Sequence, residues 1–427
     1  MAEEDRRPEQ GDRTPVLGPT DPDAPTGGRP EVDPGARRAD RSAAGRRSMM
    51  QTPASWLPTI KVSIASIVLA LVVGAFLIVF SDRRVIESLG YFFSYPWDFF
   101  AFSGEAIGQS YWALLTGSLG SGNAISQTLE RAAPLICAGL GVSLAFRAGL
   151  FNIGAQGQLI IGAVFAGYVG FGIDLPVGLH LLVALVAGVA GGAIWGAISG
   201  YLKAQTGAHE VITTIMLNYV ASSVLLYLLT KEAFQRPGSN NPLSPPAADS
   251  ALFPTVLGFH SGVFVAIGVA FAIWWLLERS TLGFEMRAVG ANADAARTAG
   301  MSVPKVYTLT MLVAGALAGL AAVQQILGHH DSLTTNVAGA IGFDAITVAL
   351  LGRATPLGTV LAGLLFGALS AGGVQMQASE ASTPLELTQV LQALIVLFVA
   401  APALVRGILR IKETGGAATV MAKGWGS

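Results

Sequence analysis

The chain reads TLGFEMRAVGANADAARTAGM from Thr281 to Met301, a small polar stretch set between two long apolar segments. These segments, residues 262–277 and 306–326, approach or reach the length of about 20 residues that crosses the hydrocarbon core of a membrane. The stretch is rich in Gly and Ala and carries charges of both signs, so it does not continue either apolar helix. It therefore predicts a polytopic membrane protein with a compact loop at one membrane surface.

The composition of the whole chain also indicates a membrane protein. Apolar residues make up 52% of the 427 residues and charged residues 12%, against about 25% charged residues in soluble domains. Residues 1–52 are charge-rich and have no apolar period, so they cannot bury enough surface to offset the entropy of ordering. We expect a disordered cytoplasmic tail at 1–52, a transmembrane domain at 53–412, and a short cytoplasmic tail at 413–427.

Ten segments are apolar enough to cross the membrane or to enter it as re-entrant helices. They are residues 62–80, 127–146, 153–173, 177–202, 211–229, 262–277, 306–326, 338–352, 357–377 and 387–405. This predicts an all-α fold with about ten transmembrane or partly re-entrant helices. Ten helices divide into two sets of five, and an odd number per set would make the second set an inverted repeat of the first.

Arg and Lys predict the orientation, because cytoplasmic loops carry an excess of them. With both termini in the cytoplasm, the basic residues on the cytoplasmic side are Arg41, Arg46, Arg47, Arg147, Lys203, Arg279, Arg287, Arg297, Lys305, Arg353, Arg406, Arg410 and Lys412. The basic residues on the outer side are then only Arg83, Arg84, Arg131, Lys231 and Arg236.

Two further segments fall outside the spans. Residues 82–126 are rich in aromatic side chains, which predicts an external amphipathic segment at the level of the lipid headgroups. Residues 230–261 are rich in proline and predict an external loop. A plain connection is the favoured interpretation of each, although either could contact an external partner.

Glycines inside the spans predict close helix packing rather than a binding site. They recur in residues 188–200, and again at Gly315 and Gly319. Small residues at such spacing let two helix backbones approach closely.

Polar residues at membrane depth are the candidates for a solute path, because they are costly there unless they meet a partner or water. The candidates are Asn152, Gln156, Thr214, Asn218, Gln324 and Asp344. Asn152 and Gln156 interrupt an apolar stretch and predict a discontinuous helix. Thr214 and Asn218 belong to a polar stripe on the fifth span. Hydrogen bonding between helices explains the amides near residue 152 equally well.

Motifs for catalysis are absent from the sequence. It has no GxxxxGK[ST], HExxH or GxSxG motif, so we expect no catalytic residue and no ATP hydrolysis by this chain. His329, His330 and Asp331 have no further ligand at a useful spacing, and we expect no metal site. We also expect no nucleic-acid partner. If ATP drives transport, a separate subunit must bind ATP and Mg²⁺.

Four motifs together resemble one family of membrane proteins. In order they are FRAGLFNIGAQGQ (146–158), EVITTIMLNY (210–219), TLGFEMRAVGANADAARTAG (281–300) and GFDAITVALLGRATPLG (342–358). The combination is similar to the permeases of bacterial ABC importers of the branched-chain amino acid and simple-sugar superfamily, above all to its nucleoside and simple-sugar branch. The resemblance runs from about Ile125 to Val405. Family members often carry Glu where this chain has Gln156.

The resemblance implies a multi-pass protein of the bacterial cytoplasmic membrane that works with several partners. These are a cytoplasmic ABC ATPase, a second and shorter permease subunit, and an external substrate-binding lipoprotein. It also implies that residues 281–301 are the coupling loop that sits on the ATPase. The matching positions are Arg287, Gly290, Asn292, Ala295, Ala296, Arg297 and Gly300.

The residues of this loop are consistent with that role. Ala293–Ala299 is a good helix former, Asn292 can cap its start, and Gly300 can end it. A short rigid helix with small side chains would fit a cleft on a partner. An ordinary cytoplasmic connection is the alternative.

The sequence therefore predicts a permease that imports nucleosides, small polar solutes without a fixed charge. A simple-sugar permease of the ribose type is the alternative within the same class. A secondary transporter driven by an ion gradient would need ionisable groups near the middle of the membrane, and only Asp344 suits that purpose. A membrane scaffold without transport activity would use its polar residues only to join helices.

Overall fold

The structure is a computed structural model that describes residues 57–330, 332–379 and 384–409. The predicted tails at 1–52 and 413–427 lie outside the described residues, as does Asp331. The described residues from Ile60 onward form one compact unit. The description below concerns that unit.

The described residues are almost entirely helical, as the composition predicts. The α-helices are α2 Leu57–Ser81, α3 Arg83–Leu89, α4 Pro96–Leu119, α5 Gly122–Arg147, α6 Ala155–Gly172, α7 Leu179–Thr206, α8 Glu210–Leu229, α9 Gly262–Arg279, α10 Thr281–Ala291, α11 Ala293–Thr298, α12 Val303–Gln325, α13 Ile341–Leu351, α14 Pro356–Ala378, α15 Leu385–Ala400 and α16 Pro402–Leu409. The shorter elements are η2 Asp249–Ala251, β1 Thr255–Val256, β2 Phe259–His260 and η3 Ile326–His330.

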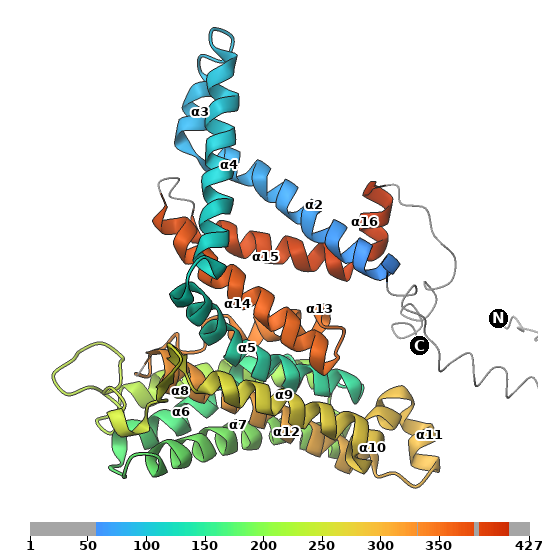
Figure 1. Cartoon of the computed structure of the whole chain (residues 1–427). Helices are drawn as coiled ribbons and strands as arrows, with labels where there is room; N and C mark the ends of the chain where they lie inside the picture. The colour runs from blue at the N-terminus through green and yellow to red at the C-terminus, as the bar shows by residue number, and fades with distance from the viewer. Residues whose placement is uncertain (1–56, 331, 380–383, 410–427) are drawn as a thin grey trace, which may run out of the picture. The chain divides into compact units, whose positions relative to one another are not determined.

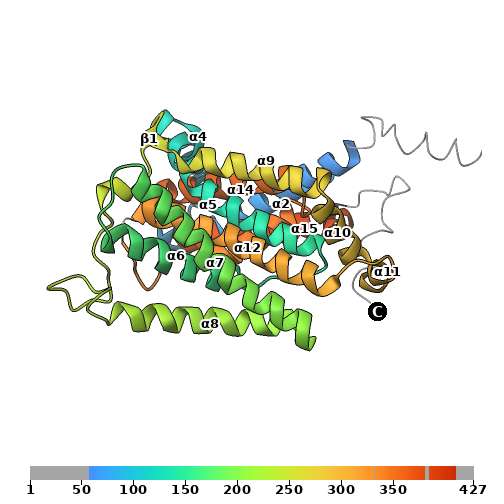
Figure 2. The same ribbon diagram turned by 90° about the horizontal axis from the view of Figure 1, so that it is seen from below.

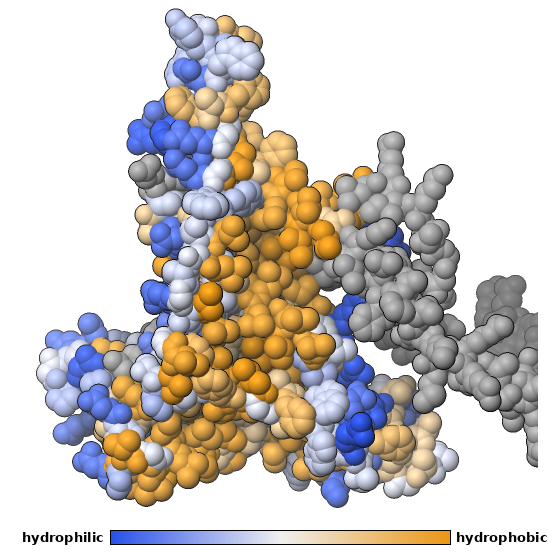
Figure 3. Space-filling model, in the orientation of Figure 1, coloured by the Kyte–Doolittle hydropathy of each residue, from blue (hydrophilic) through white to orange (hydrophobic). Residues whose placement is uncertain are grey.

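Each of the ten predicted spans coincides with a helix. Eight helices in the described residues are long and apolar enough to cross a membrane: α2, α5, α6, α7, α8, α9, α12 and α14. The other two predicted spans correspond to the shorter apolar helices α13 and α15. In Figure 3 hydrophobic residues cover the middle of the visible face, and hydrophilic residues gather toward its ends. The chain is therefore an all-α, multi-pass membrane protein.

Helices α5 and α12 pack against each other near the centre of the unit and run in opposite directions. Gln324 of α12 contacts Cys137 of α5, whereas Ala314, ten residues earlier, lies against Gly141. Figures 1 and 2 show α10 and α11 at one end of these helices and the loop of residues 230–261 toward the other. We call these the α10–α11 end and the loop end.

The contacts around this central pair repeat in the two halves of the chain. Helix α12 packs on α6 and α7, and α5 packs in the same way on α13 and α14. Helix α6 further contacts α8, and α13 contacts α15. Since α5 and α12 are antiparallel, this pattern is the one that an inverted repeat produces.

The predicted packing glycines form a tight contact between α7 and α12. A Cβ atom added to Gly192 would overlap the carbonyl oxygen of Gly315, and one added to Gly319 would overlap the carbonyl oxygen of Gly188. The two backbones therefore touch without side chains between them. The assignment of these glycines to packing is confirmed.

Residues 82–126 are more regular than the sequence suggests. They contain the helices α3 and α4 and the first turn of α5, which begins at Gly122 rather than near residue 127. In Figures 1 and 2, α4 runs across the direction of α7 and α12 rather than along it. Trp97 and Trp112 of α4 are exposed. A helix that lies along the membrane surface would have this orientation, but the predicted position at the headgroups stays a prediction.

Residues 230–261 form a docked cap rather than a plain connection. The amide of Ser244 donates to the carbonyl of Leu333, and the amide of Phe253 donates to the carbonyl of Leu327, at 3.0 and 2.9 Å. The η2 turn lies against α7, and β2 lies against α5. Backbone hydrogen bonds therefore hold this segment, the docked cap, over the ends of the helices. The proline-rich composition of the segment does not predict these bonds.

Candidate functional site

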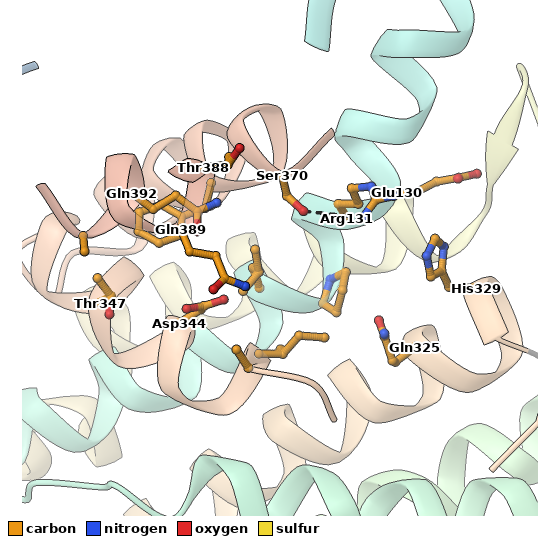
Figure 4. Close-up of a pocket in the computed structure, with 16 residues that line it drawn as sticks. Glu130, Arg131, Gln325, His329, Asp344, Thr347, Ser370, Thr388, Gln389 and Gln392 are labelled. Carbon is orange, nitrogen blue, oxygen red and sulfur yellow. Dashed lines mark hydrogen bonds between the residues drawn. The ribbon is translucent and has the colours of Figure 1, made fainter. Parts of the chain in front are cut away.

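A cavity of about 420 Å³ lies between α5, α13, α14 and α15, next to the end of α12. This volume is within the range of about 300–1,000 Å³ found for sites of small molecules. Figure 4 shows the polar residues that line it, and they come from helices far apart in the sequence. They are Glu130, Arg131, Gln325, His329, Asp344, Thr347, Ser370, Thr388, Gln389 and Gln392.

One side of the cavity is formed by the first half of α5. Pro134 lies inside this helix and lines the cavity, and a proline there removes one backbone hydrogen bond of the helix. One Nη of Arg131 donates to Ser370 Oγ at 3.4 Å, while Arg131 Nε is buried without a partner. The guanidinium can therefore offer further N–H groups to a ligand.

Glu130, beside Arg131, joins the cavity to the docked cap. One of its carboxylate oxygens accepts the backbone N–H of His260 at 3.1 Å. Burial lowers the pKa of the His260 ring below its ordinary value, and the nearby charge of Glu130 opposes this shift. The titratable groups that line this side of the cavity are Glu130, Arg131 and His329.

The opposite side of the cavity carries Asp344, in the first turn of α13. Its side chain is partly buried, and among the described residues its carboxylate has no hydrogen bond or ion pair. In Figure 4 Asp344 and Gln389 lie together, away from Arg131 and Ser370. The cavity thus has a group that only accepts hydrogen bonds on one side and a group that only donates them on the other.

Four amides form a separate polar group at the start of α6, which we call the amide cluster: Asn152, Gln156, Gln158 and Asn218. Asn152 and Gln158 exchange two hydrogen bonds at 3.1 and 3.2 Å. The oxygen of Asn152 also accepts the amide of Gly154 at 2.9 Å. These bonds hold residues 148–154, which separate α5 from α6 as the predicted break in the helix.

Asn218 and Gln156 join the start of α6 to α8 and α13. Asn218 donates to the carbonyl of Ile153 at 3.0 Å and accepts the amide of Gly157 at 2.8 Å. Gln156 donates to the carbonyl of Gly339 at 2.8 Å and accepts the amide of Gly342 at 2.9 Å. The amide groups of both side chains are therefore engaged with the backbone of this chain.

The structure thus divides the six predicted path residues. Asp344 lines the cavity, whereas Asn152, Gln156 and Asn218 belong to the amide cluster. Thr214 donates to the carbonyl of Glu210 in its own helix at 2.7 Å. Gln324 donates to the carbonyl of Gly262 at 3.2 Å, and it is the next residue, Gln325, that lines the cavity.

Sequence reasoning missed the polar residues of α15. Gln392 follows Thr388 by four positions and Gln389 by three on an otherwise apolar helix. A similar spacing marks the polar stripe on residues 210–222. Polar residues at helical spacing could therefore have predicted that α15 lines a polar site. Arg131 was assigned only to the outer side of the membrane, because its pairing with Ser370 depends on the tertiary structure.

Residues 281–301 form two helices, α10 and α11, as their sequence predicts. Asn292 caps α11, since its oxygen accepts the amides of Asp294 and Ala295 at 3.0 and 2.9 Å. Gly300 ends the segment with φ of 86°, a conformation that favours glycine. The predicted short rigid helix is confirmed.

The seven predicted coupling residues do not form one exposed surface. Gly290, Asn292, Ala295, Arg297 and Gly300 are exposed, whereas Ala296 is buried against the protein. Arg287 is partly buried, with its guanidinium 3.9 Å from the carboxylate of Glu278. Only the exposed positions are available to a partner without rearrangement.

Gly290 lies against the end of α5. A Cβ atom added to it would overlap the carbonyl oxygen of Arg147 and would lie 2.8 Å from the amide nitrogen of Gly149. Gly290 therefore contacts this chain itself, and any larger residue there would push α10 away from α5.

Comparisons with known proteins find relatives along most of this chain. Residues 124–400 match the model of a family described as the permease component of the branched-chain amino acid transport system. The chain is 38% identical over 319 residues to the guanosine ABC transporter permease protein NupP of Bacillus subtilis (strain 168), with 73% of this chain and 91% of NupP covered.

Two further relatives are similar over most of their length. The glucose ABC transporter permease protein TsgB13 of Haloferax volcanii is 36% identical over 307 residues, with 69% of this chain and 79% of TsgB13 covered. The nucleoside ABC transporter permease protein NupB of Lactococcus lactis subsp. cremoris (strain MG1363) is 33% identical over 302 residues, with 68% of this chain and 82% of NupB covered.

Proposed function

We propose that this chain, which belongs to the family of permease components of branched-chain amino acid transport systems, is the membrane subunit of an ATP-driven nucleoside importer. The assignment of nucleosides as the substrate rests on the 38% identity to a permease named for guanosine, of which 91% is covered. A second relative named for nucleosides supports it. The relative named for glucose keeps a simple-sugar permease as the alternative.

The chemistry of the cavity supports a nucleoside as its ligand. A nucleoside has no fixed charge but presents hydroxyl donors on the ribose and both donors and acceptors on the base. Asp344 can accept hydrogen bonds from ribose hydroxyls, and Arg131 can donate to base acceptors such as O6 and N7 of guanine. Gln325, Gln389 and Gln392 add amides that can donate and accept. The oxygens of a sugar could also accept hydrogen bonds from Arg131, so it is the relatives named for nucleosides that favour a nucleoside over a sugar.

The α10–α11 end is assigned to the cytoplasm in this proposal. It carries Arg279, Arg287, Arg297 and Lys305, which are in excess over the basic residues near the loop end. A cytoplasmic ATPase that binds ATP and Mg²⁺ would then contact the exposed face of α11, and a substrate-binding lipoprotein would contact the loop end. A second permease subunit would complete the membrane core.

Transport would follow from a change in the population of two states of the complex. The ATPase would favour one arrangement of α10 and α11, and the cavity would be open to one side of the membrane in each state. This chain hydrolyses no ATP in the proposal. Its own residues form the path and transmit the movement.

Uptake by cells tests the substrate. We would measure entry of radiolabelled guanosine, adenosine, uridine, ribose and glucose into cells with and without this gene, with its partner genes present. Loss of nucleoside uptake alone is the expected result. Loss of sugar uptake alone would move the proposal to the sugar alternative, and no loss for any solute would contradict both.

Ala295→Trp tests the contact with the ATPase. Ala295 is exposed on α11, so a large side chain there should block a close-fitting partner without disturbing the fold. Co-purification of the ATPase should fall at least tenfold. Thr298→Ala, which removes only a hydrogen bond within α11, is the matched control. Normal association of the Ala295→Trp variant would show that α11 is not the docking surface.

A further inference from the structure

Arg147, the last residue of α5, lies between the α10–α11 segment and the helix that carries Asp344. Its backbone contacts α10, because Gly290 and Gly149 approach so closely that neither could carry a Cβ atom without a clash or a tight contact. This contact joins two backbones directly. A displacement of α10 therefore moves the end of α5, with no flexible side chain to absorb it.

The side chain of Arg147 reaches in the other direction, to the turn between α13 and α14. Its Nε donates to the carbonyl oxygen of Ala354 at 2.8 Å. A guanidinium has its donors in a fixed plane, so this bond restricts the position of the turn. Arg147 thus joins three segments: α5, α10 and the α13–α14 turn.

The turn itself has an unusual backbone. Arg353 and Ala354 have φ values of 53° and 49°, a left-handed conformation that residues other than glycine rarely adopt. The amide of Ala354 donates to the carbonyl of Ala349 at 2.8 Å, which fixes the turn to the last part of α13. Such strain persists where the surrounding contacts impose it, and the bond from Arg147 is one of these contacts.

Helix α13 is short, and its other end carries the cavity. Asp344 lies seven residues before Leu351, about 10 Å along the helix. The start of α13 is fixed to Gln156 by two hydrogen bonds. The helix is therefore held at one end by the amide cluster and at the other end by the turn that Arg147 contacts.

We propose that Arg147 is the positioning residue through which movement of α10 reaches α13 and changes the position of Asp344 in the cavity. The inference rests on the proposed function, since it requires a partner ATPase that moves α10 and a solute that uses the cavity. It adds a specific route, from Gly290 through Arg147 and Ala354 to Asp344.

The test uses the complete transporter in proteoliposomes and one introduced cysteine. Cys137 is the only cysteine of the chain and is fully buried, so Cys137→Ala gives a background without thiols. Thr347→Cys then places one thiol at the cavity, one turn from Asp344. The rate of its reaction with a maleimide is measured with and without ATP trapping of the ATPase. Uptake and ATP hydrolysis are measured in parallel in the Cys137→Ala background in which Thr347 is intact, and this protein and its Thr347→Cys derivative together serve as the parent.

With Arg147 present, ATP trapping should change the labelling rate at least fivefold. Arg147→Gln should reduce this change to less than twofold and lower uptake about tenfold, while ATP hydrolysis stays within about twofold. Arg147→Lys retains a long side chain with a donor and should restore part of the response. Arg353→Gln, which removes the neighbouring exposed charge but not the bond, is the matched control and should behave as the parent.

The outcomes separate the two proposals. If the parent shows neither uptake nor ATP-dependent labelling, the proposed function fails. If the parent responds and Arg147→Gln responds equally, the route through Arg147 is wrong. The route is also wrong if Arg353→Gln has the same effect as Arg147→Gln, because the cause would then be charge at this end. A parallel loss of ATP hydrolysis, uptake and thermal stability in Arg147→Gln would indicate a structural role only.

Discussion

The amide cluster and the cavity are two polar regions in the same apolar protein. They differ in whether their polar side chains find hydrogen-bond partners within the protein. In the amide cluster, Asn218 and Gln156 each both donate to and accept from the backbone of this chain. In the cavity, Asp344 has no such bond among the described residues, and Arg131 Nε has none either. The first region joins helices, and the second has bonding capacity left for a ligand.

The chemistry of the side chains explains the difference. A carboxamide has a donor and an acceptor, so it can replace the bonds missing from a broken helix, where both kinds of backbone group are free. A carboxylate only accepts and a guanidinium only donates, so each needs a partner of the opposite kind. A polar residue at membrane depth therefore indicates a need for a partner. The protein itself supplies this partner in the amide cluster, and we propose that the solute supplies it in the cavity.

The largest effect should come from Asn218→Leu. It leaves the amide of Gly157 and the carbonyl of Ile153 without partners, at a cost of about 1–3 kcal/mol for each buried group. We expect a clear loss of thermal stability in detergent. Ser222→Ala, one turn further along α8, removes only a bond to the carbonyl of residue 218 in the same helix and should change little. If Asn218→Leu keeps full stability but alters uptake, Asn218 lines the solute path rather than stabilising the fold.

Asp344→Asn should have the next largest effect. We expect it to reduce solute uptake rather than the stability of the protein. A hydrogen bond to a charged group contributes about 1.5–3 kcal/mol, so we expect uptake to fall at least tenfold. The stability should hold, because no bond within the described protein is lost. Glu386→Gln, at the exposed start of α15, controls for loss of a negative charge. A large loss of stability in Asp344→Asn would contradict the assignment of this carboxylate to the solute.

Gln156→Glu should have a smaller effect. It tests the amide cluster by removing only the N–H donor of this side chain while keeping an acceptor oxygen. The carboxylate can still accept the amide of Gly342, but it can no longer donate to the carbonyl of Gly339. We expect stability to fall by about 1 kcal/mol, with the loss confined to neutral and alkaline pH. Thermal unfolding at two pH values measures it. A gain in stability would show that the charge finds a partner in the complex.

The smallest effect should come from Gln392→Ala. The side chain lines the cavity, so its removal should cost one neutral hydrogen bond to the solute, about 0.5–1.5 kcal/mol. The concentration for half-maximal uptake should rise about threefold, with stability unchanged. Gln389→Ala should act in the same direction. Unchanged uptake in both variants would mean that the solute does not contact α15.

Much of the fold follows from the sequence by itself. Apolar length determined eight of the ten spans, because a helix in lipid must satisfy its own backbone over about 20 residues, whereas α13 and α15 are shorter apolar helices. Local chemistry determined the short helix α11, since Asn292 and Gly300 supply its two ends only eight positions apart. The glycines of α7 and α12 were correctly assigned to packing. Each of these features has a signal in the local sequence, although the glycines meet their partners only when α7 packs on α12.

Only the tertiary structure decided which polar residues are free for a ligand. Asn218 and Asp344 are both polar interruptions of apolar sequence, and nothing local separates them. Asn218 meets Ile153 and Gly157 at the start of another helix in the folded chain, while Asp344 faces a cavity formed by helices as distant as α5 and α15. The contact between Arg147 and Ala354 joins residues 207 positions apart. Hydrogen bonds of this kind depend on how helices pack, and the sequence specifies that packing only through the whole set of contacts.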